Sequence, residues 1–129
     1  MNERIQQELA LLRHYYPDTE YREAGEWILL PHYRMPTGSW DHDEVSVAFQ
    51  IPTGYPANKP YGFHIRPRVL LKDGRSPNNC APSSEPPFGG DWLKFSWDVP
   101  GWRPTADLQT GNNLWNFVLT VAERLKEGA

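Results

Sequence analysis

Apolar residues near the N-terminus recur with the spacing of an α-helix. From Asn2 to about Tyr16 the apolar positions follow one another at intervals of four, three and four residues, and they are Ile5, Leu9, Leu12 and Tyr16. Side chains at these intervals share one helical face, and polar residues fill the rest of the turn. Pro17 ends the pattern because proline lacks an amide hydrogen and disfavours helical geometry in the preceding residue. The pattern predicts an amphipathic helix packed on a sheet.

Three later segments carry the pattern of β-strands. Glu26–Leu30 and Glu44–Ile51 are rich in β-forming residues, and the second alternates Val45, Val47, Phe49 and Ile51 with its other positions. Both segments predict antiparallel strands. A third candidate strand spans Gly62–Leu71, where Pro67 limits the prediction to an edge strand or a bulged one. Asp73-Gly74 predicts the turn that follows.

The segment after this turn has no periodic pattern. Arg75–Gly90 contains four prolines and ends in two glycines, which predicts a long irregular loop. Three tryptophans then recur every five residues, at Trp92, Trp97 and Trp102. This spacing fits neither a helical face nor a strand face. We expect an irregular aromatic stretch that covers the core, in preference to one that presents a binding surface to a protein partner.

A second helical pattern closes the chain. It begins near Asn112-Asn113, ends at Gly128, and places five apolar residues on one face: Leu114, Phe117, Val118, Val121 and Leu125. The order along the chain is helix, antiparallel strands in a meander, long irregular loop and helix. That order predicts an α+β fold rather than alternating βαβ units, and the length predicts one domain over residues 1–129.

Composition excludes several classes of function. The net charge of −3 comes without a block of Lys or Arg, so neither nucleic acid nor a membrane surface is an expected partner. No apolar run approaches the roughly 18 residues that a membrane span requires. Cys80 is the only cysteine, which excludes an internal disulfide framework and a thiolate-rich zinc site. A free thiol fits a reducing compartment, and we expect the cytoplasm.

Other candidate chemistry is weaker. Trp40–Glu44 groups one histidine with three carboxylates, which could suggest a hard metal ion, but such a run before a strand more often forms a solvated turn. The sequence contains no nucleophile elbow, glycine-rich phosphate loop or paired zinc-ligand motif. We therefore expect neither a metal site nor a cofactor.

The most specific motif lies between two of the predicted strands. A strand ends at Pro52, Tyr55-Pro56 follows, and Pro60 precedes the next strand. This Tyr-Pro-x-x-x-Pro motif resembles that of the ubiquitin-conjugating-enzyme family, whose catalytic cysteine lies about 25 residues beyond the tyrosine. Cys80 stands at that distance from Tyr55.

The resemblance continues on both sides of this motif. The family's Trp-x-Pro step before a helix is matched by Trp102-Arg103-Pro104, and the resemblance covers the chain from about Asn2 to Leu125. It is nearest to the divergent bacterial branches, which are associated with ubiquitin-like proteins, an activating enzyme and a metal-dependent peptidase. We expect the motif residues to form a fold signature beside the site.

The resemblance implies a function for the single thiol. Cys80 would receive a ubiquitin-like protein from a ubiquitin-activating-type enzyme, carry it as a thioester and pass it to an amine. A departure from the family pattern bears on the second step. The His-Pro-Asn tripeptide that usually precedes the cysteine is absent, since Leu70–Gly74 stands there. Asn79, or its neighbour Asn78, is the candidate to stabilise the oxyanion in place of the missing asparagine.

Two alternatives to this activity remain open at this stage. In the first, the chain is a catalytically inert module that keeps the fold only to bind a ubiquitin-like protein or an assembly partner, which the missing tripeptide favours. In the second, it is a structural or regulatory domain without a link to ubiquitin, because antiparallel α+β sheets host many functions.

Overall fold

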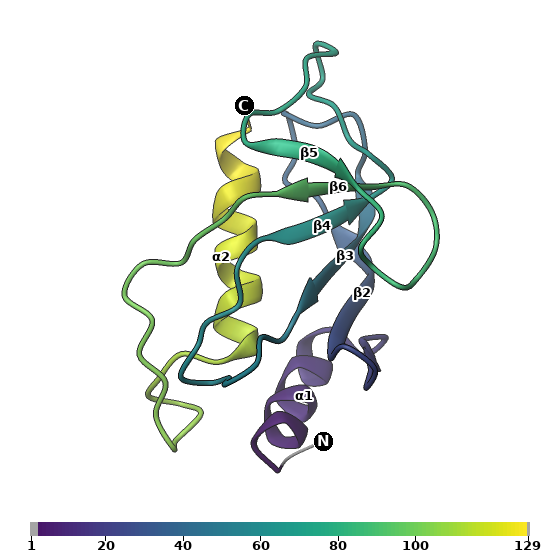
Figure 1. Cartoon of the computed structure of the whole chain (residues 1–129). Helices are drawn as coiled ribbons and strands as arrows, with labels where there is room; N and C mark the ends of the chain where they lie inside the picture. The colour runs from purple at the N-terminus through teal and green to yellow at the C-terminus, as the bar shows by residue number, and fades with distance from the viewer. Residues whose placement is uncertain (1–2, 129) are drawn as a thin grey trace.

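Two helices cover one face of a six-stranded antiparallel sheet in the computed structural model, which describes residues 3–128 (Figure 1). The sheet order is β1-β2-β3-β4-β6-β5, so the first four strands form a meander and the last two exchange places. Along the chain the elements are α1 (Glu3–Tyr15), β1 (Glu20–Arg22), β2 (Trp27–Arg34), β3 (Glu44–Gln50), β4 (Phe63–Arg66), β5 (Cys80–Ser83), β6 (Trp92–Phe95) and α2 (Leu114–Glu127). The predicted α+β class is confirmed.

The main core fills the space between the helices and the sheet. Helix α1 contributes Ile5, Leu9 and Leu12, the residues of its predicted apolar face, while Tyr16 packs against the core just beyond the helix. The predicted start of this helix, Asn2, lies outside the described residues. Removal of these side chains from water is the main stabilising term for such an arrangement, at about 25 cal/mol per Å² of apolar surface.

Strands β2 and β3 confirm the first two strand predictions. Alternate residues of β3 and the position just after it, Val45, Val47, Phe49 and Ile51, all face the main core. Strand β2 is longer than predicted and runs to Arg34, with an irregularity in its pairing between Leu30 and Tyr33. Strand β1 was not predicted, since its three residues are too few for a periodic pattern.

The third predicted strand is shorter and more central than the sequence suggested. Strand β4 ends at Arg66, immediately before Pro67, because proline cannot donate the next ladder hydrogen bond. It pairs with β3 on one side and β6 on the other, so the expectation of an edge strand is wrong. The predicted turn at Asp73-Gly74 is present, and the Gly74 amide donates to the Leu71 carbonyl oxygen at 2.8 Å.

Two strands replace parts of the predicted irregular segments. Within Arg75–Gly90, strand β5 pairs with β6, and β6 itself begins the Trp-rich stretch. The expectation of irregular structure at these places is wrong, because tertiary pairing forms strands of only four residues that carry no sequence period of their own. Pro82 is compatible with β5 because this strand lies at the edge of the sheet, where one side of its backbone needs no partner.

Helix α2 agrees closely with its prediction. The Asn113 side chain accepts a hydrogen bond from the Asn116 amide and the Asn116 side chain accepts one from Asn113, which forms a capping box. Gly128 terminates the helix, and its amide donates to the Leu125 carbonyl oxygen. Neither helix within residues 3–128 combines the length and the apolar character that crossing a bilayer would need.

The other face of the sheet carries a smaller aromatic cluster. Trp27, Leu29, Ala48 and Trp92 are buried there, and Phe88, from the green loop that joins β5 to β6 in Figure 1, packs over them. Arg66 donates to the carbonyl oxygens of Phe88 and Gly89, at 2.8 Å each, and its guanidinium lies 4.7 Å from the Trp92 ring. The second half of the predicted irregular loop therefore covers the sheet.

His64 is buried under this cover. Its side chain projects from β4 toward Trp27, with ring centroids 5.5 Å apart, and only 4% of the residue is exposed. Neither ring nitrogen has a hydrogen-bond partner among the described residues. Burial lowers the pKa of His64 to about 4, so the imidazole is neutral at ordinary pH.

The buried His64 predicts a pH dependence of stability. In the unfolded chain the imidazole binds a proton near pH 6.5, and in the folded chain only near pH 4. The unfolded state therefore binds more protons between these two pH values. The contribution of the neutral His64 to the free energy of unfolding is complete above pH 6.5 and is lost as the pH falls through 4. Urea unfolding should show that wild type loses up to about 3 kcal/mol more than His64→Leu between these values. The exposed His32→Gln should behave as wild type, and parallel curves for wild type and His64→Leu would contradict the assignment.

Candidate functional site

Cys80 is the first residue of β5, the strand at one edge of the sheet. It lies opposite Phe95 of β6, so its side chain points to the helix-covered face, where it packs against the main core. The thiol is half-buried. An edge strand leaves one side of the backbone without a neighbour, so a partner could approach Cys80 from that side.

The turn before Cys80 is held by both neighbouring elements. The Asn78 carbonyl oxygen accepts hydrogen bonds from the Cys80 thiol at 3.1 Å and from Nη2 of Arg124 in α2 at 2.8 Å. On the other side, the Asn79 carbonyl oxygen accepts from the Ser96 amide at 2.9 Å. These contacts fix the position of the sulfur atom relative to the sheet and the last turn of α2.

Asn79 occupies the left-handed region of backbone space, with φ of +58°. Asparagine adopts this conformation more readily than most residues, which explains its presence in a tight turn. Its side chain is exposed beside Cys80, as is that of Asn78. The structure thus brings both predicted asparagines to the cysteine, with their carbonyl groups used for folding and their side-chain amides on the surface.

The surroundings of the thiol favour its protonated form. Burial raises the pKa of Cys80 to about 11, and the nearby Arg124 guanidinium offsets part of that effect. At pH 7 only about one molecule in ten thousand would carry the thiolate, which is the reactive form. Any reaction at this sulfur therefore depends on groups that can stabilise its negative charge.

The Tyr-Pro motif stands at the other end of α2. Tyr55 and Pro60 are buried, and the loop is tied to the Trp-x-Pro step by a hydrogen bond from Trp102 Nε1 to the Pro56 carbonyl oxygen at 2.9 Å. Pro52 and Pro104 lie partly buried in the same two segments. The structure brings these predicted signature residues together, and Figure 1 shows their loops at the start of α2, far from the start of β5. The expectation that they lie beside Cys80 is therefore wrong, because they pack at the opposite end of α2.

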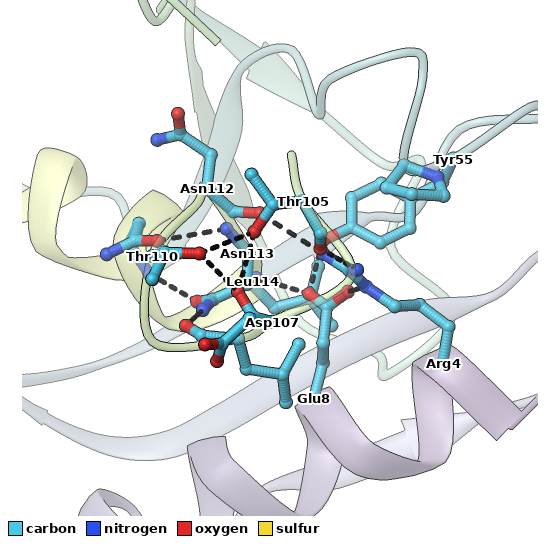
Figure 2. Close-up of polar contacts among 12 residues, drawn as sticks. Arg4, Glu8, Tyr55, Thr105, Asp107, Thr110, Asn112, Asn113 and Leu114 are labelled. Atoms are coloured by element: carbon cyan, nitrogen blue, oxygen red, sulfur yellow. Dashed lines mark hydrogen bonds and ion pairs between the residues drawn. The ribbon is translucent and has the colours of Figure 1, made fainter. Parts of the chain in front are cut away.

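The buried carboxylate of Glu8 is the hydrogen-bond acceptor for the hydroxyl of the signature tyrosine, Tyr55. The Glu8 side chain is fully buried and accepts hydrogen bonds from the Tyr55 hydroxyl, from the Leu114 amide at 2.7 Å and from Arg4 Nε at 2.5 Å (Figure 2). Burial and this carboxylate raise the pKa of Tyr55 above its ordinary value, so the hydroxyl keeps the proton that it donates. A carboxylate at the first turn of α2 is also favoured by the helix dipole.

Arg4 extends the network to the segment before α2. Besides Glu8, it donates to the backbone carbonyl oxygens of Thr105 and Asn112, as the dashed lines of Figure 2 show. Neither Arg4 nor Glu8 was predicted from the sequence. The available signal was the position of Glu8, which falls on the apolar face between Ile5 and Leu12.

The run Trp40–Glu44 connects the segment before β3 to helix α2 and to the segment after β4. Trp40 is buried and donates from Nε1 to the Leu125 carbonyl oxygen at 2.8 Å, and the Asp41 carboxylate accepts from the Leu70 amide. His42 lies 2.7 Å from this same carboxylate, which lowers the pKa of Asp41 despite partial desolvation. Within residues 3–128, no three potential metal-binding side chains come together.

The helix–sheet–helix arrangement is consistent with the ubiquitin-conjugating-enzyme-like, or E2-like, class of α+β proteins. Comparison with known families makes the assignment more specific, because the profile described as prokaryotic E2 family E matches residues 8–127. The chain therefore belongs to the prokaryotic E2 family E. No curated protein and no solved structure matches it. Family membership indicates ubiquitin-like protein conjugation, and partners of the ubiquitin-like and activating-enzyme classes, at the level of the family.

The hydrogen bond between Tyr55 and Glu8 predicts a measurable loss of stability. Tyr55→Phe leaves a buried carboxylate with one donor fewer, and we expect unfolding in urea to show a destabilisation of about 1–3 kcal/mol. The matched control is Tyr61→Phe, since Tyr61 is 60% exposed and its hydroxyl has no recorded partner among the described residues. That control should stay within about 0.5 kcal/mol of wild type.

A double-mutant cycle tests whether the loss of stability in Tyr55→Phe is due to Glu8. In a Glu8→Gln background the additional effect of Tyr55→Phe should shrink, because the hydroxyl no longer serves a charged acceptor. Equal losses from the two tyrosine variants, or full additivity with Glu8→Gln, would contradict the role of the buried carboxylate.

Proposed function

We propose that Cys80 carries a ubiquitin-like protein as a thioester and passes it to an amine acceptor. The observation that supports this most is the position of the chain's only cysteine, half-buried on an edge strand behind a fixed turn, in a member of an E2 family. A carrier thiol must be reachable by a second protein and held in one geometry, and the edge strand and the fixed turn support these two requirements.

The reaction would proceed in two acyl transfers. The Cys80 thiol first loses its proton to solvent, and its sulfur attacks the activated C-terminal carbonyl carbon of the ubiquitin-like protein. The bond between that carbon and the activating enzyme breaks, and the group on the enzyme leaves with the electron pair. An amine nitrogen then attacks the Cys80 thioester, the sulfur leaves as a thiolate, and the nitrogen gives up a proton. Each attack places negative charge on the carbonyl oxygen, which the exposed amide of Asn79 would stabilise by donating a hydrogen bond. The cytoplasm is the compartment that we propose, because a carrier thiol needs reducing conditions.

Two observations favour a second candidate function. The raised pKa of Cys80 and the hydrogen bond from its thiol to the Asn78 carbonyl oxygen are also features of an unreactive cysteine. In that case the chain would bind a ubiquitin-like protein or an assembly partner without carrying it.

A charging experiment tests the carrier role. Wild type, Cys80→Ala and Cys80→Ser are incubated with ATP, the activating enzyme and its ubiquitin-like protein, and intact masses are measured. Wild type should gain one partner mass less one water, and excess dithiothreitol should remove it. Cys80→Ala should gain nothing, whereas any adduct on Cys80→Ser should resist the thiol because it is an oxyester. An uncharged wild type beside a charged activating enzyme would exclude the carrier role and leave the binding module.

The role of Asn79 is tested separately by transfer from the charged protein. Asn79→Gly removes the amide but keeps the left-handed backbone, which glycine adopts without strain. We expect normal charging and about a hundredfold slower discharge to free lysine. Asn78→Ala is the control, because within residues 3–128 the side chain of Asn78 makes no hydrogen bond and its carbonyl oxygen makes two. Equal discharge rates in the two variants would exclude Asn79 as the donor.

A further inference from the structure

Arg124 is a buried cation next to the proposed carrier thiol. It lies in the last turn of α2 and is only 4% exposed. Its guanidinium donates to the Gly128 carbonyl oxygen at 3.0 Å and to the Asn78 carbonyl oxygen at 2.8 Å, and it stands 5.2 Å from the centre of the Phe95 ring. Among residues 3–128, no carboxylate lies within ion-pair distance of Arg124, although the other well-buried charge, Glu8, is paired.

A buried cation without an anionic partner is unusual. Removing a charge from water costs several kcal/mol unless an opposite charge compensates for it, and neutral carbonyl groups compensate only in part. The end of a helix supplies some further compensation, because the dipole there is negative. The arrangement is therefore suited to a group nearby that becomes negative during a reaction.

The thiol of Cys80 is such a group. Its sulfur and Nη2 of Arg124 both donate to the Asn78 carbonyl oxygen, so the two side chains meet at one atom. Two uncharged residues also lie next to Cys80: Phe95 is its pairing partner in β6, and Asn78 precedes it in the turn. Lys94 of β6 projects to the opposite face of the sheet by the alternation of the strand. Arg124 is thus the charged group that acts on the thiol.

We infer that Arg124 is a positioning residue for Cys80, which holds the turn through the Asn78 carbonyl oxygen and stabilises the sulfur when it carries negative charge. This rests on the proposed carrier function. Negative charge arises on the sulfur twice, when the thiol gives its proton to solvent before the first transfer and when the thiolate leaves in the second. In both states the S–H donor to Asn78 is absent, and the guanidinium alone still holds that carbonyl.

Alkylation of the whole protein by iodoacetamide tests this without any protein partner. The rate at Cys80, followed by intact mass, should rise about tenfold per pH unit toward the thiol pKa. Arg124→Met keeps the packing against Phe95 but removes the charge, so we expect at least tenfold slower alkylation at pH 8 and a pH profile moved to higher pH. Arg124→Lys keeps the charge and should stay within about threefold of wild type.

Opposite results separate this role from a purely structural one. If Arg124 only packed the turn, its loss would expose the sulfur, and Arg124→Met would react as fast as wild type or faster, which would overturn the inference. Lys126→Met is the matched control, since Lys126 is an exposed cation of the same helical turn. Should Arg124→Met fail to melt cooperatively, Arg124→Lys decides: a profile displaced by a pH unit or more despite the retained charge would overturn the inference.

The same variants distinguish failure of the inference from failure of the proposed function. A displaced alkylation profile in Arg124→Met supports the inference even if wild type is never charged with a ubiquitin-like protein. Conversely, if wild type is charged and Arg124→Met matches it in both alkylation and charging, the proposed function stands and the inference is overturned.

Discussion

The structure depends on the buried carboxylate of Glu8. A charge without water must be satisfied by donors, and here three parts of the chain supply them: Arg4 in α1, Tyr55 in the Tyr-Pro loop and the Leu114 amide at the start of α2. Each donor would lose its acceptor if its segment moved. The two helices and the loop are therefore fixed at one point, and the apolar contacts of the core are added around it.

Helix α2 connects the Glu8 network to the turn that holds Cys80. Helix α2 starts at the Glu8 network, and Arg124 follows ten residues later, about 15 Å along the axis at 1.5 Å per residue. At that end it reaches the Asn78 carbonyl oxygen and, through it, the turn that holds Cys80. The loop around Tyr55 and the turn before Cys80 are thus attached to opposite ends of the same helix.

The sequence predicted those elements that carry their own period. Both helices and the strand predicted at Glu44–Ile51 repeat apolar residues often enough to identify the buried face, and the Tyr-Pro motif led to the family. Strands β5 and β6 were missed because four residues contain too little pattern, and their pairing is decided by partners elsewhere in the chain. Glu8 and Arg124 were missed for a related reason. Each is a charged residue on an apolar helical face, and only the fold reveals what it contacts.

The half-buried state of Cys80 has a consequence for its oxidation chemistry. Peroxides and disulfides react with thiolates, and a sulfur whose pKa is raised by burial to about 11 is almost entirely a neutral thiol at pH 7. Small oxidants therefore meet the form that they attack most slowly. The same environment that delays ordinary electrophiles slows the oxidation of the chain's single thiol, which would favour the reduced form that the proposed carrier function requires.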